Sequence, residues 1–452
     1  MPEKRDKVIN EEHGLPIGQP KRKRQRVILR LKPLSYSQHD LDAKAEAPVL
    51  ETKETIDGIS YGTTEEIPYD KRGFKYTPCR PNPYFKSTKY STTDLPPYKA
   101  RLSYFDRSQD TLVNKYMDEA TVERGWRSCR TNIGFREGRW YVEYKLLKAN
   151  DGKSNVRFGI ARKEASVEAP VGYDGYGYGF RDKLGEKVHL SKPAAFLKNG
   201  EEFHAGDVIG LLVELPDMKT QMETAKRQIR DRTTTDPEEE ERKEELNIAE
   251  KDKKKDKGLD EPDFTQVGVI RDAVPIKYRN KLFFEQYEYT YSMPMDHLLY
   301  PVTVFGEKAV RDKKKFKPAK LPNSRITLYK NGEKKGVAFE GLFAFLPPCS
   351  EQEQLNINLH REYNKFYVGR DDGSLGYYPM VSCFDGGRIM INTSEKLEYV
   401  PEDLRQDLDE GNIRPFSSRY NGFVVEGYTY DLVDETVNRY LDRMEKTLKV
   451  SS

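Results

Sequence analysis

Residues 138–160 read GRWYVEYKLLKANDGKSNVRFGI, and their alternation of apolar and polar side chains decides the fold class. Successive side chains of a β-strand point to opposite faces, so a period of two is typical of antiparallel strands that are buried on one face. The residues that share the apolar face here are Val142, Tyr144, Leu146, Val156, Phe158 and Ile160. This stretch therefore predicts two β-strands.

The same strand signature recurs along the chain beyond Gly125. Further strands are expected at residues 208–215, 282–291, 326–330 and 387–392. Asn331-Gly332 is a preferred pair for a two-residue type I′ turn because both positions need positive φ, although KNGEKKG could also close as a longer loop. Many short strands with little helix predict a mainly β protein, an antiparallel β-sandwich over residues 125–430.

The segments outside this sandwich are expected to be extended or disordered. Residues 1–60 predict a basic, largely disordered arm, and residues 61–124, rich in proline and tyrosine, predict an extended segment packed on the sandwich. Residues 217–263 hold 16 acidic and 12 basic side chains and no aromatic residue, which predicts a disordered insertion. Residues 307–320 predict a basic loop.

The end of the chain predicts an amphipathic helix over residues 431–449. Asp431 is an acceptable N-cap, and further acidic residues in the first turn complement the helix dipole. Apolar residues recur at spacings of three and four, and they are Val433, Val437, Tyr440, Leu441 and Met444. Such a stripe can pack on its own domain or bind a partner helix, and its position after the last strand favours the partner.

Charge and composition exclude several classes of protein. The 77 lysines and arginines nearly cancel the 74 acidic residues, so a uniformly polybasic protein is excluded. No window approaches the roughly 20 apolar residues of a membrane helix, and the N-terminus lacks the apolar stretch of a signal peptide, so we expect an intracellular protein. The four cysteines are too scattered for a disulfide framework or a zinc knuckle and predict buried free thiols.

Motifs for catalysis are not found in the sequence. The six histidines form no HxH or HExxH spacing, and no GxSxG, Walker A or Rossmann glycine motif occurs. The sequence therefore predicts a chain without enzymatic activity, cofactor or metal. A hydrolase whose site is assembled in space stays an alternative, in which replacing His189 or His204 would destroy turnover.

The sandwich sequence resembles a known family. Six stretches are similar to the SPRY (B30.2-like) domain, a bent β-sandwich used for peptide recognition: GWRSCRTNIGF, GRWYVEYKLL, VRFGIARKEASVEAPVGYDGYGYGFRDKLGEKVH, FHAGDVIGLLVELP, ITLYKNGEKKGVAFEGLF and YPMVSC. The APVGYDGYGYGFR stretch and the terminal helix resemble the SPRY subunit of COMPASS (Set/MLL-type) histone H3 lysine 4 methyltransferase complexes. This is the Ash-two-like family, and its fungal Bre-two members look most similar.

The resemblance implies a pocket that binds an acidic segment of a WD-repeat subunit. The matching residues here are Trp126, Arg157, Pro170, Tyr173, Arg181 and Lys183. Guanidinium groups pair with carboxylates through two parallel hydrogen bonds, so such a pocket would select Asp or Glu. Without the resemblance, Arg157 alternates with Val156 and Phe158 and would only cover the outer face of a strand.

The resemblance also implies a role for the terminal helix, which would dock into a small dimeric four-helix subunit of DPY type. The expected anchors are Val433, Val437, Tyr440, Leu441 and Met444. The chain would then be a non-catalytic scaffold in the nucleus that positions a SET-domain methyltransferase on the nucleosome and supports chromatin-regulated transcription.

The basic residues of the arm are Lys21, Arg22, Lys23, Arg24 and Arg26. They fit a nuclear-import signal first and salt-sensitive contacts with nucleosomal DNA second, and a solvated tail is an equally simple interpretation. Two rival functions remain. A SPRY adaptor of a ubiquitin ligase ought to carry a RING, B-box or SOCS-type box, and none is visible; a nucleic-acid-binding protein would lose its main activity on deletion of residues 1–32.

Overall fold

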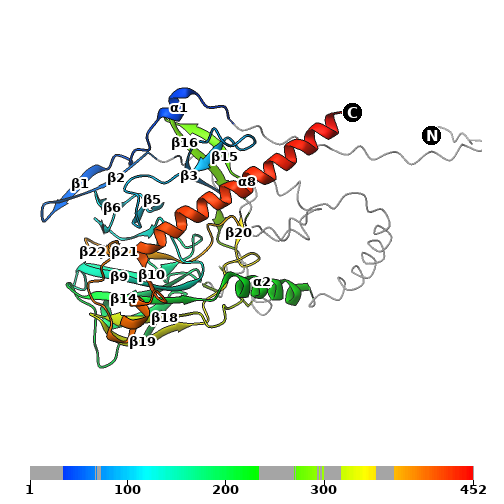
Figure 1. The fold of residues 1–452 in the computed structure, drawn as a ribbon. Coiled ribbons are helices and arrows are strands. Elements are labelled where there is room, and N and C mark those ends of the chain that lie inside the picture. The colour runs from blue at the N-terminus through cyan, green and yellow to red at the C-terminus, as the bar shows by residue number, and fades with distance from the viewer. Residues whose placement is uncertain are drawn as a thin grey trace, which may run out of the picture.

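Two large sheets pack face to face in the structure, a computed structural model that describes residues 34–66, 68, 73–233, 269, 271–292, 295, 298–299, 317–352 and 371–450. A smaller sheet lies beside this sandwich, and a long C-terminal helix runs diagonally across the molecule (Figure 1). The predicted fold class, a mainly β protein with antiparallel sheets and a C-terminal helix, is confirmed.

The first sheet holds, in spatial order, β1 (Glu51–Ile56), β2 (Ile59–Thr63), β6 (Thr111–Asn114), β7 (Glu119–Val122), β22 (Arg388–Ile391), β9 (Gly138–Lys148), β14 (Val208–Leu215), β18 (Arg325–Lys330) and β19 (Glu333–Glu340). A short strand pairs with β9 in parallel, β23 (Arg414–Pro415). The second sheet holds β13 (Lys192–Ala195), β12 (Glu186–His189), β11 (Gly177–Arg181), β10 (Asn155–Ala161), β21 (Tyr378–Phe384), β8 (Trp126–Thr131) and β5 (Leu102–Arg107).

Two smaller sheets and several helices complete the described fold. The sheets are β15 (Val274–Tyr278), β16 (Lys281–Tyr287), β3 (Phe74–Pro81) and β4 (Tyr90–Thr92), and β17 (Tyr289–Thr290) with β20 (Glu351–Gln352). The α-helices are α1 (Gln38–Asp42), α2 (Met218–Thr233), α7 (Arg405–Asp409) and α8 (Arg419–Val450). The 3₁₀ turns are η1 (Lys183–Gly185), η4 (Glu402–Leu404) and η5 (Phe416–Ser418).

The main core lies between the two large sheets, as the alternation predicts. Val142 and Tyr144 of β9 are buried in it with Phe158 of β10, and the Tyr144 hydroxyl donates to the Gly159 carbonyl at 2.7 Å. The opposite face of β9 is covered as well, since Tyr141 packs in a second cluster with the turn and helix near residues 404–413. Strand β9 is therefore buried on both faces, where the sequence pattern predicted one.

The predicted hairpin at Asn331-Gly332 is confirmed. Both residues have positive φ, 51° and 82°, and Lys330 pairs with Glu333 across the turn. Asparagine and glycine tolerate this left-handed conformation better than other residues do. The Asn331 side chain also accepts a hydrogen bond from the Val208 amide at 2.8 Å, so the turn is tied to the start of β14.

The N-terminal segment supplies strands to the sandwich, where the sequence predicted only an extension packed on it. Strands β5, β6 and β7 come from residues 102–122, and β1 and β2 come from residues 51–63. All five belong to the two sheets of the sandwich, so the sandwich begins before Gly125, and the prediction of a largely disordered arm is wrong for residues 51–60.

The proline-rich part ahead of β5 forms β3 and β4, which pair with each other and with β16. Single prolines fit in β3 because it changes partner along its length: residues 74–78 pair with β16 and residues 79–81 pair with β4, so Pro78 and Pro81 are each paired on one side and can spare a backbone donor.

Helix α2 lies inside the segment 217–263 that was predicted to be disordered, so this prediction is wrong for residues 218–233. The helix packs Ala225 and Met218 against the main core and is also held by polar contacts. Gln221 donates to the carbonyl oxygens of Arg136 and Pro216, at 2.5 and 2.8 Å, and the Cys349 thiol donates to Gln228. The rest of this segment, and most of the predicted basic loop 307–320, lie outside the described residues.

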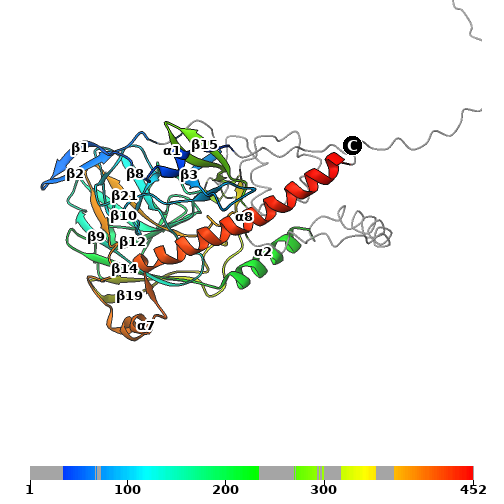
Figure 2. The ribbon, with the colours of Figure 1, turned by 45° about the horizontal axis from the view of Figure 1, so that its top comes forward.

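Helix α8 begins at Arg419, twelve residues before the predicted start at Asp431, so Asp431 is not its N-cap. It lies in the helix interior, where its carboxylate accepts from the Thr92 amide at 3.0 Å and pairs with Arg271 at 2.5 Å. One turn later, Glu435 accepts from the amides of residues 86–88. The acidic residues thus attach α8 to the β3–β4 region, and α8 and α2 leave the sandwich on the same side (Figure 2).

All four cysteines are buried and free, as predicted. Within the described part of the chain, no helix is both long enough and apolar enough to cross a membrane.

His189 gives the folded state a dependence on pH. Its Nδ1 lies 2.8 Å from the Gly177 carbonyl oxygen, and its ring stacks on Tyr178 at 4.3 Å. Burial lowers the pKa of His189 from 6.5 to about 4. Between these two pH values His189 is protonated in the unfolded chain but neutral in the folded chain. The free energy of unfolding therefore decreases as the pH falls from 6.5 towards 4.

We expect the free energy of unfolding to fall by about 2 kcal/mol between pH 7 and pH 5 because of His189 alone. Urea denaturation at both pH values measures it, and a His189→Gln variant should lack this component. His204, whose ring is exposed, supplies the control, since a His204→Gln variant should keep the slope of the wild type. Equal pH slopes in all three proteins would contradict the assignment.

Candidate functional site

A small cationic pocket opens on the outer face of the second sheet, away from the core. It has a volume of about 260 Å³. Its lining residues are Trp126, Asn155, Arg157, Arg181, Asp182, Lys183 and Phe384. Four of the six pocket residues that the sequence predicts, Trp126, Arg157, Arg181 and Lys183, are therefore brought together by the fold.

Strand register explains why residues so far apart in sequence meet here. Trp126 of β8 pairs with Phe384 of β21, and Phe384 pairs with Asn155 of β10. Arg157, two residues further along β10, pairs with Arg181 of β11. Because side chains at alternate positions share a face, the same alternation that buries the apolar residues of β10 points Arg157 outward into the pocket.

Arg157 is the central cation of the pocket. Its guanidinium carbon lies 4.9 Å from the centroid of the Trp126 ring, a cation–π contact that holds the side chain over the indole. Its Nε is buried and has no hydrogen-bond partner among the described residues. Burial, followed by the nearby charge of Arg181, lowers the pKa of Arg157 to about 10. An anion bound here would offset both the cost of burying the guanidinium and its repulsion from Arg181.

The other charged residues of the pocket are partly or fully engaged. Arg181 Nη1 pairs with Glu186 at 2.5 Å. The Asp182 carboxylate is buried and accepts from the backbone amides of Asn150, Val156 and Lys183 at 2.8–2.9 Å. Lys183 itself is exposed. The pocket therefore has more unpaired positive than negative charge, and it suits a carboxylate ligand.

Pro170 and Tyr173, the other two predicted residues, are not among the lining residues. They belong to a loop that lies over the same face of the sheet. Two hydrogen bonds fix this loop: Ser128 Oγ donates to the Ala169 carbonyl at 2.7 Å, and the Val171 amide donates to Ser382 Oγ at 3.0 Å. Ser382 is the cross-strand partner of Arg157. Pro170, between these two anchors, is therefore placed beside the pocket and not in its wall.

The sequence analysis missed Asn155, Asp182 and Phe384. Asn155 and Phe384 could have been found from strand periodicity, since Asn155 lies two residues before Arg157 and Phe384 ends the YPMVSC strand on its outward face. Asp182 gave no such signal, because its carboxylate accepts hydrogen bonds from the backbone amides of Asn150, Val156 and Lys183, a role that leaves no periodic pattern.

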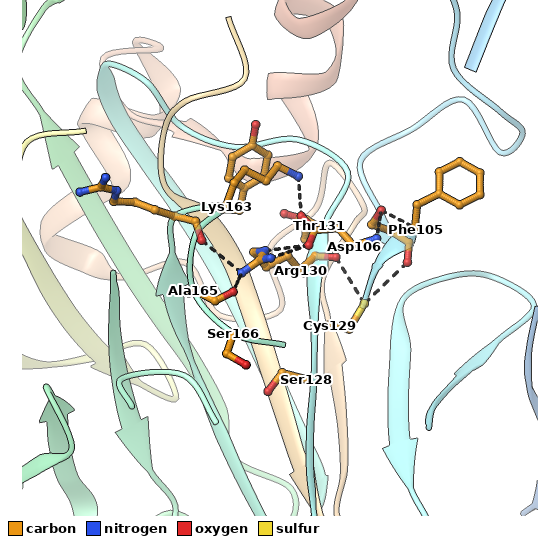
Figure 3. A network of polar contacts seen from close by, with 12 residues as sticks. Phe105, Asp106, Ser128, Cys129, Arg130, Thr131, Lys163, Ala165 and Ser166 are labelled. Atoms are coloured by element: carbon orange, nitrogen blue, oxygen red, sulfur yellow. Dashed lines mark hydrogen bonds and ion pairs between the residues drawn. The ribbon is translucent and has the colours of Figure 1, made fainter. Parts of the chain in front are cut away.

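A buried network of polar contacts fixes the start of the loop that carries Pro170 (Figure 3). Arg130 Nη2 pairs with Asp106 at 2.6 Å and Arg130 Nη1 donates to the Ala165 carbonyl at 2.6 Å. Lys163 Nζ pairs with the other oxygen of Asp106 at 2.5 Å. Burial alone would raise the pKa of Asp106, but the charges and hydrogen bonds of Arg130 and Lys163 hold it well below its usual range.

A larger cleft of about 1240 Å³ lies beside this network, between β3, β5 and the loop 163–168. Its charged walls are mostly neutralised by partners within the chain, such as Lys75 with Asp372 at 2.6 Å and Arg101 with Asp94 at 2.7 Å. Among the described residues no group of three or more His, Cys, Asp or Glu side chains is arranged to hold a metal.

Helix α8 exposes apolar side chains along its outward face. Of the predicted anchors, Leu441 and Met444 are exposed, whereas Val433, Val437 and Tyr440 are half-buried. A second exposed set, which the sequence analysis did not single out, precedes them, and its members are Val424, Val425, Tyr428 and Leu432. The predicted residues of the basic arm, 21–26, lie outside the described residues.

Sequence comparison finds relatives over most of the chain. "Set1 complex component ash2" of Schizosaccharomyces pombe is 31% identical over 413 residues, 90% of this chain and 52% of that protein. "COMPASS component cclA" of Colletotrichum higginsianum is 32% identical over 425 residues, 84% of this chain and 69% of that protein. "COMPASS component BRE2" of Saccharomyces cerevisiae is 29% identical over 470 residues, 85% of this chain and 90% of that protein.

The chain spans about half the length of the fission yeast relative. No family model matches it. Among solved structures, a human SPRY domain is similar with a TM-score of 0.27 at 10% identity, covering 64% of this chain and 98% of that domain.

Removing the Asp106 carboxylate should destabilise the fold strongly. An Asp106→Ala variant leaves Arg130, whose side chain is 5% exposed, without its counter-ion, and we expect a loss of about 3–5 kcal/mol in the free energy of unfolding, measured by chemical denaturation. Asp110, which pairs with Arg127 from a side chain 65% exposed, is the matched control, and an Asp110→Ala variant should lose at most about 1 kcal/mol. A loss of at most about 1 kcal/mol in Asp106→Ala, as expected for the control, would show that the network is not stabilising.

Proposed function

The chain belongs to the Ash2-like family of COMPASS components, and we propose that it is a non-catalytic scaffold subunit of a Set1-type histone H3 lysine 4 methyltransferase complex. Its work is assembly. Holding a mobile SET-domain enzyme in its active arrangement raises the population of competent complexes, and this requires differential binding energy but no chemistry from the scaffold. We infer a nuclear location from this role on chromatin.

The pocket is proposed to bind an acidic segment of the WD-repeat subunit. The observation that carries this proposal is the buried, unpartnered Nε of Arg157, held against Trp126 and beside Arg181. A buried polar nitrogen without a partner is costly, and on a half-buried guanidinium it marks a position that a ligand carboxylate completes. Rigid aromatic rings around it reduce the entropy that binding must cost.

Helix α8 is proposed to bind a small DPY-type dimer through the stripe of Val433, Val437, Tyr440, Leu441 and Met444. Its acidic residues face the body of the protein, where Asp431 and Asp434 pair with Arg271 and Glu435 accepts from residues 86–88. The helix is therefore already formed and fixed before a partner arrives, which lowers the entropic cost of helix-in-groove recognition.

A pull-down with the purified WD-repeat, DPY-type and SET-domain subunits tests the pocket. An Arg157→Ala variant should bind the WD-repeat subunit at least about tenfold more weakly, because one charge-assisted hydrogen-bonding group is removed. Arg157→Lys should lose part of this affinity, since lysine keeps the charge without the planar fork. Arg139→Ala, which removes an arginine paired with Glu214 outside the pocket, should bind like the wild type. Undiminished binding by Arg157→Ala would contradict the proposal.

Two paired substitutions on α8 test the helix without removing the residues that attach it. Leu441→Asp with Met444→Asp places charges in the proposed stripe, at exposed positions, and should abolish capture of the DPY-type dimer while the WD-repeat subunit still binds. Val425→Asp with Tyr428→Asp is the matched control on the other exposed set. Loss of the dimer in the control but not in the first pair would move the docking face to the second set.

A further inference from the structure

Three charged residues stand side by side at one end of the second sheet. Arg157 of β10 is the cross-strand partner of Arg181 of β11. Glu186, the first residue of β12, lies next to Arg181 in the neighbouring strand, and its Oε2 accepts from Arg181 Nη1 at 2.5 Å. The two arginines of the pocket therefore have different surroundings, because Arg181 is paired with Glu186 whereas Arg157 forms no ion pair with any residue that the structure describes.

Glu186 holds the position that a ligand carboxylate would take at Arg181. Its side chain is 17% exposed and that of Arg181 is 29% exposed, so the pair is partly shielded from water. Arg181 lines the pocket, and Glu186 contacts it from outside the lining residues. Only Nη1 of Arg181 is engaged in this contact. An incoming carboxylate can still reach the remaining donors of the guanidinium, but only by approaching Glu186 at a distance where like charges repel.

We infer that Glu186 is an internal competitor of the acidic ligand, which occupies Arg181 in the empty pocket and keeps the affinity of the site moderate. This inference rests on the proposed function, and it adds how that site is regulated. In the empty state Glu186 reduces the repulsion between Arg157 and Arg181. In the bound state the ligand supplies that negative charge, and Glu186 becomes an unfavourable neighbour.

The ion pair between Glu186 and Arg181 could have either of two roles. If Glu186 served to orient Arg181 for binding, its loss would weaken binding. If it competes, neutralising it strengthens binding, and the gain shrinks when salt screens the charges. Glutamine is the suitable replacement because its side-chain oxygen can still accept from Arg181 while the negative charge is gone.

The experiment titrates the purified WD-repeat subunit into the full-length chain at low salt and at about 0.5 M salt, with wild type, Glu186→Gln and Arg157→Ala. We expect Glu186→Gln to bind at least about fivefold more tightly than wild type at low salt, and the gain to fall below about twofold at high salt. Glu186→Met also lacks the charge and should show the same gain in affinity. This second variant controls for a folding defect that is specific to glutamine.

Glu333→Gln is the matched control, because it changes the net charge equally at a side chain 75% exposed, away from the pocket. An equal gain in this control would overturn the inference, since net charge alone would then explain it. Unchanged or weaker binding by Glu186→Gln, with binding still lost in Arg157→Ala, would overturn the competitor role and leave the proposed function standing. Wild-type binding by Arg157→Ala would remove the proposed function and the inference together.

Discussion

The alternation of side chains along β10 is the constraint on which the rest of this structure depends. Phe158 and its apolar neighbours must enter the core, because they are the layer that packs against β9. Since the period of a strand is two, Arg157 has to face outward. A shift of one residue in register would bury the guanidinium and expose the phenyl ring, so the core and the pocket are specified by the same pairing.

Buried charges do the positioning that apolar packing leaves open. The loop over the second sheet has few large apolar residues, and Asp106, Arg130 and Lys163 fix its start. Helix α8 is attached by the same means, through Asp434 and Glu435. Ion pairs of this kind add modest net stability but penalise every arrangement in which one charge loses its partner. They therefore give loops and a helix of mixed polarity a single position.

The pocket and α8 together describe a protein built to hold others. The pocket offers a half-buried arginine whose Nε is buried without a partner, and the helix is attached to the body of the protein by Asp431, Asp434 and Glu435. Both features reduce the entropy lost on association, which favours partners that bind through short segments. In the proposed function, Glu186 works against this preorganisation at one point, because it pairs with Arg181 where the ligand carboxylate would bind.

Local patterns in the sequence were enough to predict the two strands within 138–160, the strands at 208–215 and 326–330 and the Asn331-Gly332 turn, because strand period and turn chemistry act between near neighbours. The four residues of the pocket were predicted from the resemblance to a known family, and the fold brings them together. Local patterns could not predict that residues 102–122 enter the sandwich, that α2 forms, or that α8 begins at Arg419. Those outcomes depend on partners distant in the chain, such as the amides of residues 86–88 for Glu435. Polar contacts between remote segments leave no periodic mark in a sequence, and only the folded chain brings them together.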